Sequence, residues 1–288
     1  IFISGCGSSS QKKDEPPVYS PLQVLVPEAT GKETLGSSPM ILDVSNISQG
    51  YFIAQSDSSD LTCSLQIISP SGVLYSYFIA PGESATVTYT EGSGDYTITG
   101  YQQVQGDQYA ALYSETVTVQ LENDFLPFLY PNQYVNFTPD SKASQLALSL
   151  IDEDTVDVDA LQQIYDYVVS NLTYDYEKAD TVTTGYLPDV DETLKTGTGI
   201  CFDYAALTTA MLRSCDIPCK LQIGYAGDIK HAWIDVYIRS KGWVNQAVSF
   251  KGDTWTLMDP TFDSNSDDKE AIQDYIGDES NYTVQFTR

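Results

Sequence analysis

The sequence predicts an α+β protein in which an all-β sandwich precedes a domain of helices followed by antiparallel strands. Three observations support this prediction. Short runs rich in Val, Ile, Thr and Tyr fill residues 22–120, helical periodicity begins near residue 141, and strand-like runs return after residue 218. The chain has 288 residues, which is enough for two domains with separate cores.

The charge balance is strongly acidic and limits the classes of partner. The chain has 40 acidic and 14 basic side chains, a formal net charge of −26. Binding of nucleic acid through phosphate contacts is therefore not expected. The chain has no EF-hand motif, and no further Cys or His lies near Cys215 and Cys219 to complete a zinc site. We expect no metal and no cofactor.

Residues 1–20 read as the remnant of a lipoprotein signal followed by a tether. Ile3-Ser4-Gly5-Cys6 has the form of a lipobox, and the polar run GSSSQKKDEPP follows it. The pattern resembles a bacterial lipoprotein precursor, which implies acylation of Cys6 and an extracytoplasmic protein anchored to the cell surface by lipid alone. The alternative is that Cys6 is an ordinary residue in a frayed terminus. No later segment is long and apolar enough to span a bilayer.

Residues 21–122 are predicted to form the sandwich, of the immunoglobulin-like kind. Turn signals separate short β-rich runs, in which Cys63 is a core residue. The runs are LQVLV, ILDV, YFIAQ, TCSLQII, VLYSYFIA, ATVTYT, YTITGY and YAALYSETVTVQ. The sandwich is interpreted as a spacer or packing module, with ligand or carbohydrate binding through its exposed tyrosines as the alternative.

Residues 123–156 are predicted to be a packed connector, and residues 157–288 a second domain. The connector is rich in Pro and aromatic residues, and Ser141 is the expected N-cap of a short helix through Ile151. A second helix is expected to end near Asn171. A loop then leads to an apolar helix that starts at Cys201 and is buried nearly all round. Strands follow, and YTVQFT near the end adds one more.

Three residues at the ends of predicted elements suggest nucleophilic chemistry. Cys201 follows a Gly-Thr-Gly loop at a helix start, His231 opens the strand HAWIDVY, and Asp259 ends the strand TWTLMD. A helix N-terminus and an imidazolium both stabilise a thiolate, and a carboxylate orients the imidazole. Gly197 and Gly199 would let backbone and substrate approach the sulfur. The alternative is that all three are core residues.

These motifs resemble those of the transglutaminase-like superfamily, which has a papain-like cysteine protease fold. The resemblance covers roughly Asp157 to Ser264 and rests on Gly199-Ile200-Cys201 with the apolar helix, Ile217-Pro218, Gly224, His231-Ala232-Trp233, Trp255 and Asp259-Pro260-Thr261. It implies a triad of nucleophile Cys201, general base and acid His231, and orienter Asp259. The implied activity is amide hydrolysis or acyl transfer through a thioester, on peptides or proteins that include cell-wall peptides. The alternative is an inactive surface lipoprotein that binds peptide or glycan.

Several neighbouring residues have two readings. The Cys201 backbone N–H is one candidate oxyanion donor. Tyr174 is the second by analogy with the family, and the alternative is a packed tyrosine at a helix end. Trp233 is interpreted as a core residue or a substrate wall, and Asp203 as favourable to its helix N-terminus without a catalytic role. Cys215 and Cys219 either pair or remain buried thiols.

Overall fold

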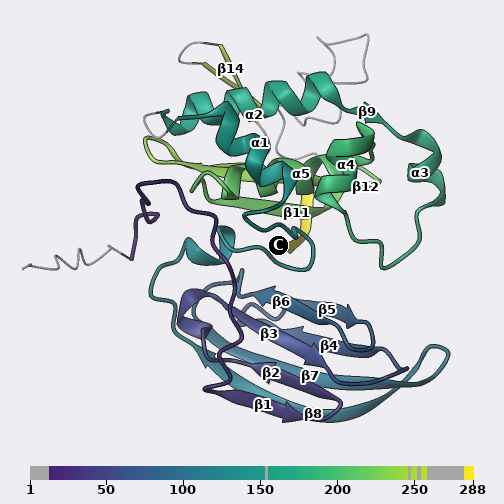
Figure 1. Cartoon of the computed structure of the whole chain (residues 1–288). Helices are drawn as coiled ribbons and strands as arrows, with labels where there is room; N and C mark the ends of the chain where they lie inside the picture. Colours follow the sequence, from purple (N-terminus) through teal and green to yellow (C-terminus); the bar gives the residue numbers. More distant parts are fainter. Residues whose placement is uncertain (1–12, 153–154, 246–247, 252–253, 258–281) are drawn as a thin grey trace, which may run out of the picture.

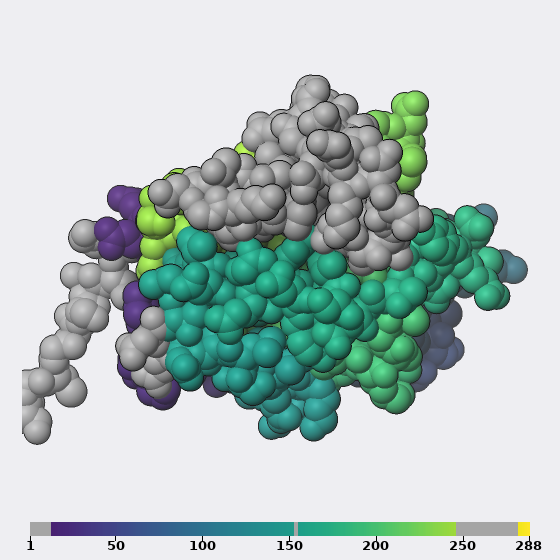
Figure 2. All heavy atoms as spheres, turned by 90° about the horizontal axis from the view of Figure 1, so that it is seen from above, coloured from purple at the N-terminus to yellow at the C-terminus, as the bar shows by residue number. Residues whose placement is uncertain are grey.

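The computed structural model describes residues 13–152, 155–245, 248–251, 254–257 and 282–288, with side chains left undescribed at 248–251 and 254–257. The chain forms a β-sandwich and an α+β part that pack against each other, and the last residues lie between them (Figure 1). Seen from the helical side, the helices cover much of the visible described surface, and the sandwich shows only at its edge (Figure 2).

The sandwich consists of two four-stranded antiparallel sheets, as predicted. One sheet has the order β1 (Thr34–Ser37), β2 (Met40–Asp43), β3 (Tyr51–Ser56) and β6 (Ser84–Thr88). The other has the order β5 (Leu74–Ile79), β4 (Cys63–Ile68), β7 (Gly94–Gln105) and β8 (Gln108–Val119). Met40, Phe52, Leu65 and Ile98 fill the space between the sheets, and Cys63 is buried there as expected. Alternation of buried and exposed side chains fixes which face of each strand points inward.

The predicted first strand is absent, because residues 22–26 have no regular secondary structure. Val24 packs into the core of the α+β part, whereas its neighbour Leu25 packs into a small cluster with Tyr51 and Tyr130. The side chains of these two neighbouring residues are therefore buried in two different clusters. The apolar pattern that suggested a strand instead reflects a segment that runs along both halves of the molecule.

Three predicted helices are present in the α+β part: α1 (Lys142–Leu150), α2 (Asp157–Asn171) and α5 (Cys201–Arg213). Ser141 precedes α1, but its hydroxyl accepts from the backbone N–H of Thr138, and Asp191 instead accepts from the N–H of Ala143 at the helix start. Ser141 therefore occupies the N-cap position, as expected, but its side chain makes no capping hydrogen bond. A carboxylate from another helix satisfies that first turn.

Two short helices, α3 (Tyr176–Thr181) and α4 (Val190–Thr196), occupy the segment predicted to be a loop. Asp175 accepts from the N–H of Lys178, and Asp189 accepts from the N–H groups of Asp191 and Glu192. Side-chain capping of this kind compensates for the few internal hydrogen bonds of a short helix.

Helix α5 packs against a four-stranded antiparallel sheet in the order β13 (Gly242–Val244), β12 (Ile229–Ile238), β11 (Cys219–Ala226) and β16 (Tyr282–Thr287). Strand β16 confirms the predicted strand YTVQFT. The hairpin of β14 (Val248–Lys251) and β15 (Thr254–Leu257) follows β13. From Asp203 to Arg213 every residue of α5 is buried, as its apolar sequence predicts.

The segment between the sandwich and α1 contacts both halves. The hydroxyl of Tyr134 donates to the carbonyl of Ser76, and the amide of Gln133 donates to the carbonyl of Phe78. Val135 and Phe137 belong to the core around α5, together with residues of α1. The core of the α+β part thus reaches back into residues assigned to the connector from sequence.

Cys215 and Cys219 are separate buried thiols and form no disulfide. The Cys219 thiol donates to the hydroxyl of Thr209 at 3.4 Å. Burial raises the pKa of both thiols to about 12. Both are therefore protonated at neutral pH and act as small core residues.

Candidate active site

Cys201 is the first residue of α5, at the end of a tight chain path. Gly197 ends α4 with φ 64°, a left-handed conformation that favours glycine. A Cβ on Gly199 would lie 2.6 Å from the Cβ of Asp203. The glycines were expected to make room for substrate. The structure gives a different reason for both, since one turns the chain and the other lets the loop close over the start of α5.

A short parallel pairing joins the nucleophile loop to Tyr174. Strand β9 (Thr173–Tyr174) pairs with β10 (Thr198–Gly199), with Tyr174 opposite Gly199. The N–H of Asp175 donates to the carbonyl of Gly199 at 2.9 Å. Tyr174 and Cys201 both line the same cavity. The backbone pairing therefore places the predicted tyrosine at the site, although the two residues are 27 positions apart (201 − 174).

His231 reaches this cavity from β12, where it lies opposite Gly224 of β11. The residue is 6% exposed, and its ring stacks on that of Trp233 with centroids 6.3 Å apart. Trp233 is 2% exposed and is not among the described lining residues of the cavity, which favours the core interpretation. A buried ring packed against an aromatic neighbour has few available orientations.

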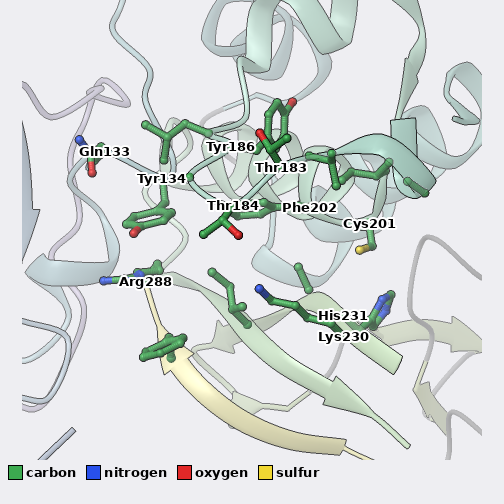
Figure 3. Close-up of a pocket in the computed structure, with 18 of the residues that line it drawn as sticks. Gln133, Tyr134, Thr183, Thr184, Tyr186, Cys201, Phe202, Lys230, His231 and Arg288 are labelled. Carbon is green, nitrogen blue, oxygen red and sulfur yellow. The ribbon is translucent and has the colours of Figure 1, made fainter. Parts of the chain in front are cut away.

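The cavity has a volume of about 550 Å³ and lies between the two halves of the molecule. The α+β part contributes Cys201, Phe202, His231 and the loop from Val182 to Leu187. Strand β5 of the sandwich contributes Leu74, Ser76 and Phe78, and the connector contributes Gln133 and Tyr134. Cys201 and His231 lie toward one end of the cavity, and Arg288 lies toward the other (Figure 3). The sandwich is thus part of the wall of the site.

Asp203 organises the start of α5 from behind the cavity. Its side chain is fully buried and accepts from the N–H of Ile200 at 2.8 Å and from Lys178 Nζ at 2.7 Å. The Tyr186 hydroxyl donates to its other oxygen. Burial lowers the pKa of Lys178, but hydrogen bonds to Asp203 and Tyr186 outweigh burial and raise it. Burial and the Asp203 carboxylate raise the pKa of Tyr186 to about 12. The predicted favourable placement of Asp203 at the helix start is confirmed.

The structure brings together three of the predicted site residues: Cys201, His231 and Tyr174 line one cavity. Asp259 and Cys6 lie outside the described residues. Sequence reasoning missed Lys230 and Arg288, which also line the cavity. Only the position of Lys230 next to His231 offered a signal. Within the described ranges, no cluster of three His, Cys, Asp or Glu side chains is suited to a metal ion.

The sequence of residues 144–260 matches the transglutaminase-like superfamily. No curated protein gives a significant match. Among solved structures, a candidate cysteine protease from Cytophaga hutchinsonii is similar at 17% identity and TM-score 0.40, over 89% of this chain and 84% of that one. The periplasmic domain of TgpA from Pseudomonas aeruginosa gives 14% and 0.34, over 74% and 91%. Red sea bream transglutaminase gives 15% and 0.27, over 75% and 48%.

None of the helices in the described ranges has the length and apolar character needed to cross a membrane. The family match begins inside α1 and extends beyond β15, so it includes α5 with Cys201 and β12 with His231. The match supports the expected fold and the expected kind of chemistry, which is thiol-dependent hydrolysis or acyl transfer. The match identifies a transglutaminase-like domain at residues 144–260, behind an N-terminal β-sandwich.

Proposed function

We propose that the protein is a thiol-dependent amidohydrolase or acyltransferase that acts on peptide or protein carboxamides. One observation carries the proposal: Cys201, at the first position of α5, and His231, on β12, line the same cavity. A thiol at a helix N-terminus next to an imidazole is the arrangement that generates a nucleophilic thiolate.

In the first step, His231 takes the thiol proton and the Cys201 sulfur attacks the carbonyl carbon of the substrate. The C–S bond forms first and the carbonyl π electrons move onto the oxygen. The C–N bond then breaks as the carbonyl re-forms, and the leaving amine takes its proton from the imidazolium. The product is a thioester acyl-enzyme and a free amine or ammonia. Asp259 is proposed to orient the imidazole, as the family resemblance implies.

The negative charge on the carbonyl oxygen needs donors in that first step. The backbone N–H of Cys201 is available for this purpose, because the first N–H groups of a helix have no partner within the helix. The Tyr174 hydroxyl is the proposed second donor. Its place in the wall of the cavity supports this role.

In the second step, water or an amine attacks the thioester. His231 takes the proton of the attacking group, the C–S bond breaks, and the Cys201 thiol is restored. Water gives hydrolysis, and an amine gives a new amide. The wall residues from the sandwich favour an extended peptide over a small amide as the substrate, since the cavity continues from Cys201 toward β5.

The test uses the full chain with mixed peptides that contain Gln and Asn, in water and with added cadaverine. Mass spectrometry should detect loss of ammonia, backbone cleavage or cadaverine addition, and a Cys201-linked acyl adduct. Cys201→Ala should abolish every product. If peptides bind but no product depends on Cys201, the proposed enzymatic activity is wrong and the alternative of a peptide-binding protein is favoured.

We also propose that the protein is held on the bacterial cell surface through an acylated Cys6, which the lipobox-like Ile3-Ser4-Gly5-Cys6 supports. The protein should be expressed in a bacterium with a lipoprotein leader and labelled with an alkyne analogue of palmitate. Labelling that disappears in Cys6→Ser supports the anchor. Equal labelling of both variants contradicts it.

A further inference from the structure

The described lining of the cavity at Cys201 has a charge balance opposite to that of the chain. The whole chain carries 40 acidic and 14 basic side chains. Among the described residues that line the cavity, Lys230 and Arg288 are the cations, and none is Asp or Glu. An acidic protein with a cationic site attracts anions to that site while its remaining surface repels them.

Neither cavity cation has a carboxylate partner in the described part of the chain. Four other cations do have one within the described residues. These ion pairs are Lys13–Asp124 at 3.7 Å, Lys178–Asp203 at 2.7 Å, Lys195–Glu192 at 2.7 Å and Arg239–Asp157 at 3.7 Å. Within the described part of the chain, the charges of Lys230 and Arg288 are therefore available to a bound molecule.

Arg288 is a fixed cation at the end of the cavity toward the sandwich. It is 4% exposed, and its guanidinium carbon lies 4.0 Å from the centre of the Tyr134 ring and 4.7 Å from that of Tyr77. Its Nη1 donates to the hydroxyl of Tyr77 at 2.6 Å, while its Nε is buried without a hydrogen-bond partner. Aromatic faces stabilise the charge without neutralising it.

Lys230 is the exposed cation of the cavity lining. It immediately precedes His231 on β12, its side chain is exposed, and its amine turns into the cavity (Figure 3). Successive side chains of a strand point to opposite faces, yet both Lys230 and His231 line this cavity. The long lysine side chain therefore brings its charge to the same cavity as the proposed base.

We propose that the site selects acyl donors with a carboxylate close to the reacting carbonyl, so that acidic peptides are its substrate class. Lys230 binds the carboxylate, and Arg288 adds a fixed positive field from the far end. The apolar side chains of Leu74 and Phe78 on β5 contact the rest of the peptide. This inference rests on the proposed function, because it takes Cys201 as the point of attack.

The test compares two alkylating reagents of similar size, iodoacetate and iodoacetamide, at Cys201 of the full chain. The rate of each is followed by peptide mass spectrometry at one pH and low ionic strength. The ratio of the two rates cancels the thiolate fraction, which both reagents share. Lys230→Gln should lower the iodoacetate-to-iodoacetamide ratio about three- to ten-fold, as expected for the loss of one nearby charge. The decrease should be smaller at 0.5 M salt.

The matched control is Lys32→Gln, which removes the same charge from an exposed position outside the cavity and should leave the ratio unchanged. A blocked Glu-containing peptide should also slow alkylation at lower concentration than its Gln counterpart, and Lys230→Gln should remove that difference. An unchanged ratio in Lys230→Gln, or an equal decrease in Lys32→Gln, overturns the inference. Neither result bears on whether Cys201 is activated by His231, which the alkylation rate itself reports.

Discussion

The buried carboxylates at the two ends of helix α5 differ in how many partners they have. At the start, Asp203 is bound by Lys178, Tyr186 and the N–H of Ile200. At the other end, Arg213 donates to the carbonyls of Cys219, Tyr130 and Arg288, so the cation lies where the helix dipole favours it.

Just beyond Arg213, the carboxylate oxygens of Asp216 are buried and make no hydrogen bond of good geometry within the described residues. Burial raises its pKa from 3.8 to about 7. The backbone N–H groups of Tyr19 and Gln23 and the charge of Arg239 offset only part of the effect of burial on its pKa. It adopts φ 58° where the chain turns out of α5. At the end that carries Cys201, the buried Asp203 carboxylate has partners and stabilises the helix start. At the opposite end, ionised Asp216 lowers the stability of the fold near neutral pH.

The largest effect on stability is expected from Asp203→Ala. The change leaves Lys178 and the N–H of Ile200 without their partner, and should lower the free energy of unfolding by about 3 kcal/mol. Urea unfolding measures it. The matched control is Glu192→Ala, which breaks an exposed ion pair with Lys195 and should cost less than about 1 kcal/mol. Equal losses in the two variants would break the comparison.

The second effect concerns Asp216 at the opposite end of the helix, and its size depends on pH. Native Asp216 holds its proton up to about pH 7, whereas the unfolded carboxyl loses it near pH 3.8. The native state therefore binds more protons between these values, so this group makes stability fall as pH rises through that window. A raised pKa of about three units corresponds to at most about 4 kcal/mol.

Asp216→Asn removes that penalty and keeps a residue type that tolerates positive φ. The variant should be more stable than the parent by about 1 to 3 kcal/mol at pH 8, with no gain at pH 4. Urea unfolding at several pH values checks it. A gain that is the same at pH 4 and pH 8 would show that ionisation of Asp216 is not the cause.

The smallest effect tests one bond at the start of α5. Tyr186→Phe removes the hydroxyl between Lys178 and Asp203 but leaves their ion pair, and should cost about 1 to 1.5 kcal/mol. Tyr176→Phe is the control, since that tyrosine is exposed. A larger loss than in Asp203→Ala would mean that Tyr186, and not the carboxylate, organises this end of the helix.

Much of the α+β part could be predicted because its signals are local. The apolar run after Cys201 indicates a buried helix that begins at this residue, and HAWIDVY indicates a strand. The strand begins two residues earlier than expected, at Ile229, so His231 is its third residue. Cys201, His231 and Tyr174 nevertheless line one cavity. The resemblance to a family then added their chemistry.

The remaining features depend on long-range packing that no short pattern encodes. Lys178 and Tyr186 meet Asp203 only because α3 and the following loop fold back over α5. The part that β5 and Arg288 play in the cavity depends on how the sandwich packs against the sheet. The apolar residues of 22–26 suggested a strand, but these residues form none. Their neighbouring side chains are buried in two separate cores instead.

The central claim is that His231 activates Cys201 as a nucleophile. The most direct test is the rate of iodoacetamide alkylation at Cys201 against pH, by peptide mass spectrometry, in the intact protein and in His231→Ala. The account predicts fast labelling well below pH 8 that is lost in the variant, which is the signature of a thiolate–imidazolium pair. Labelling that is slow at every pH below 8 and unaffected by the substitution would contradict it.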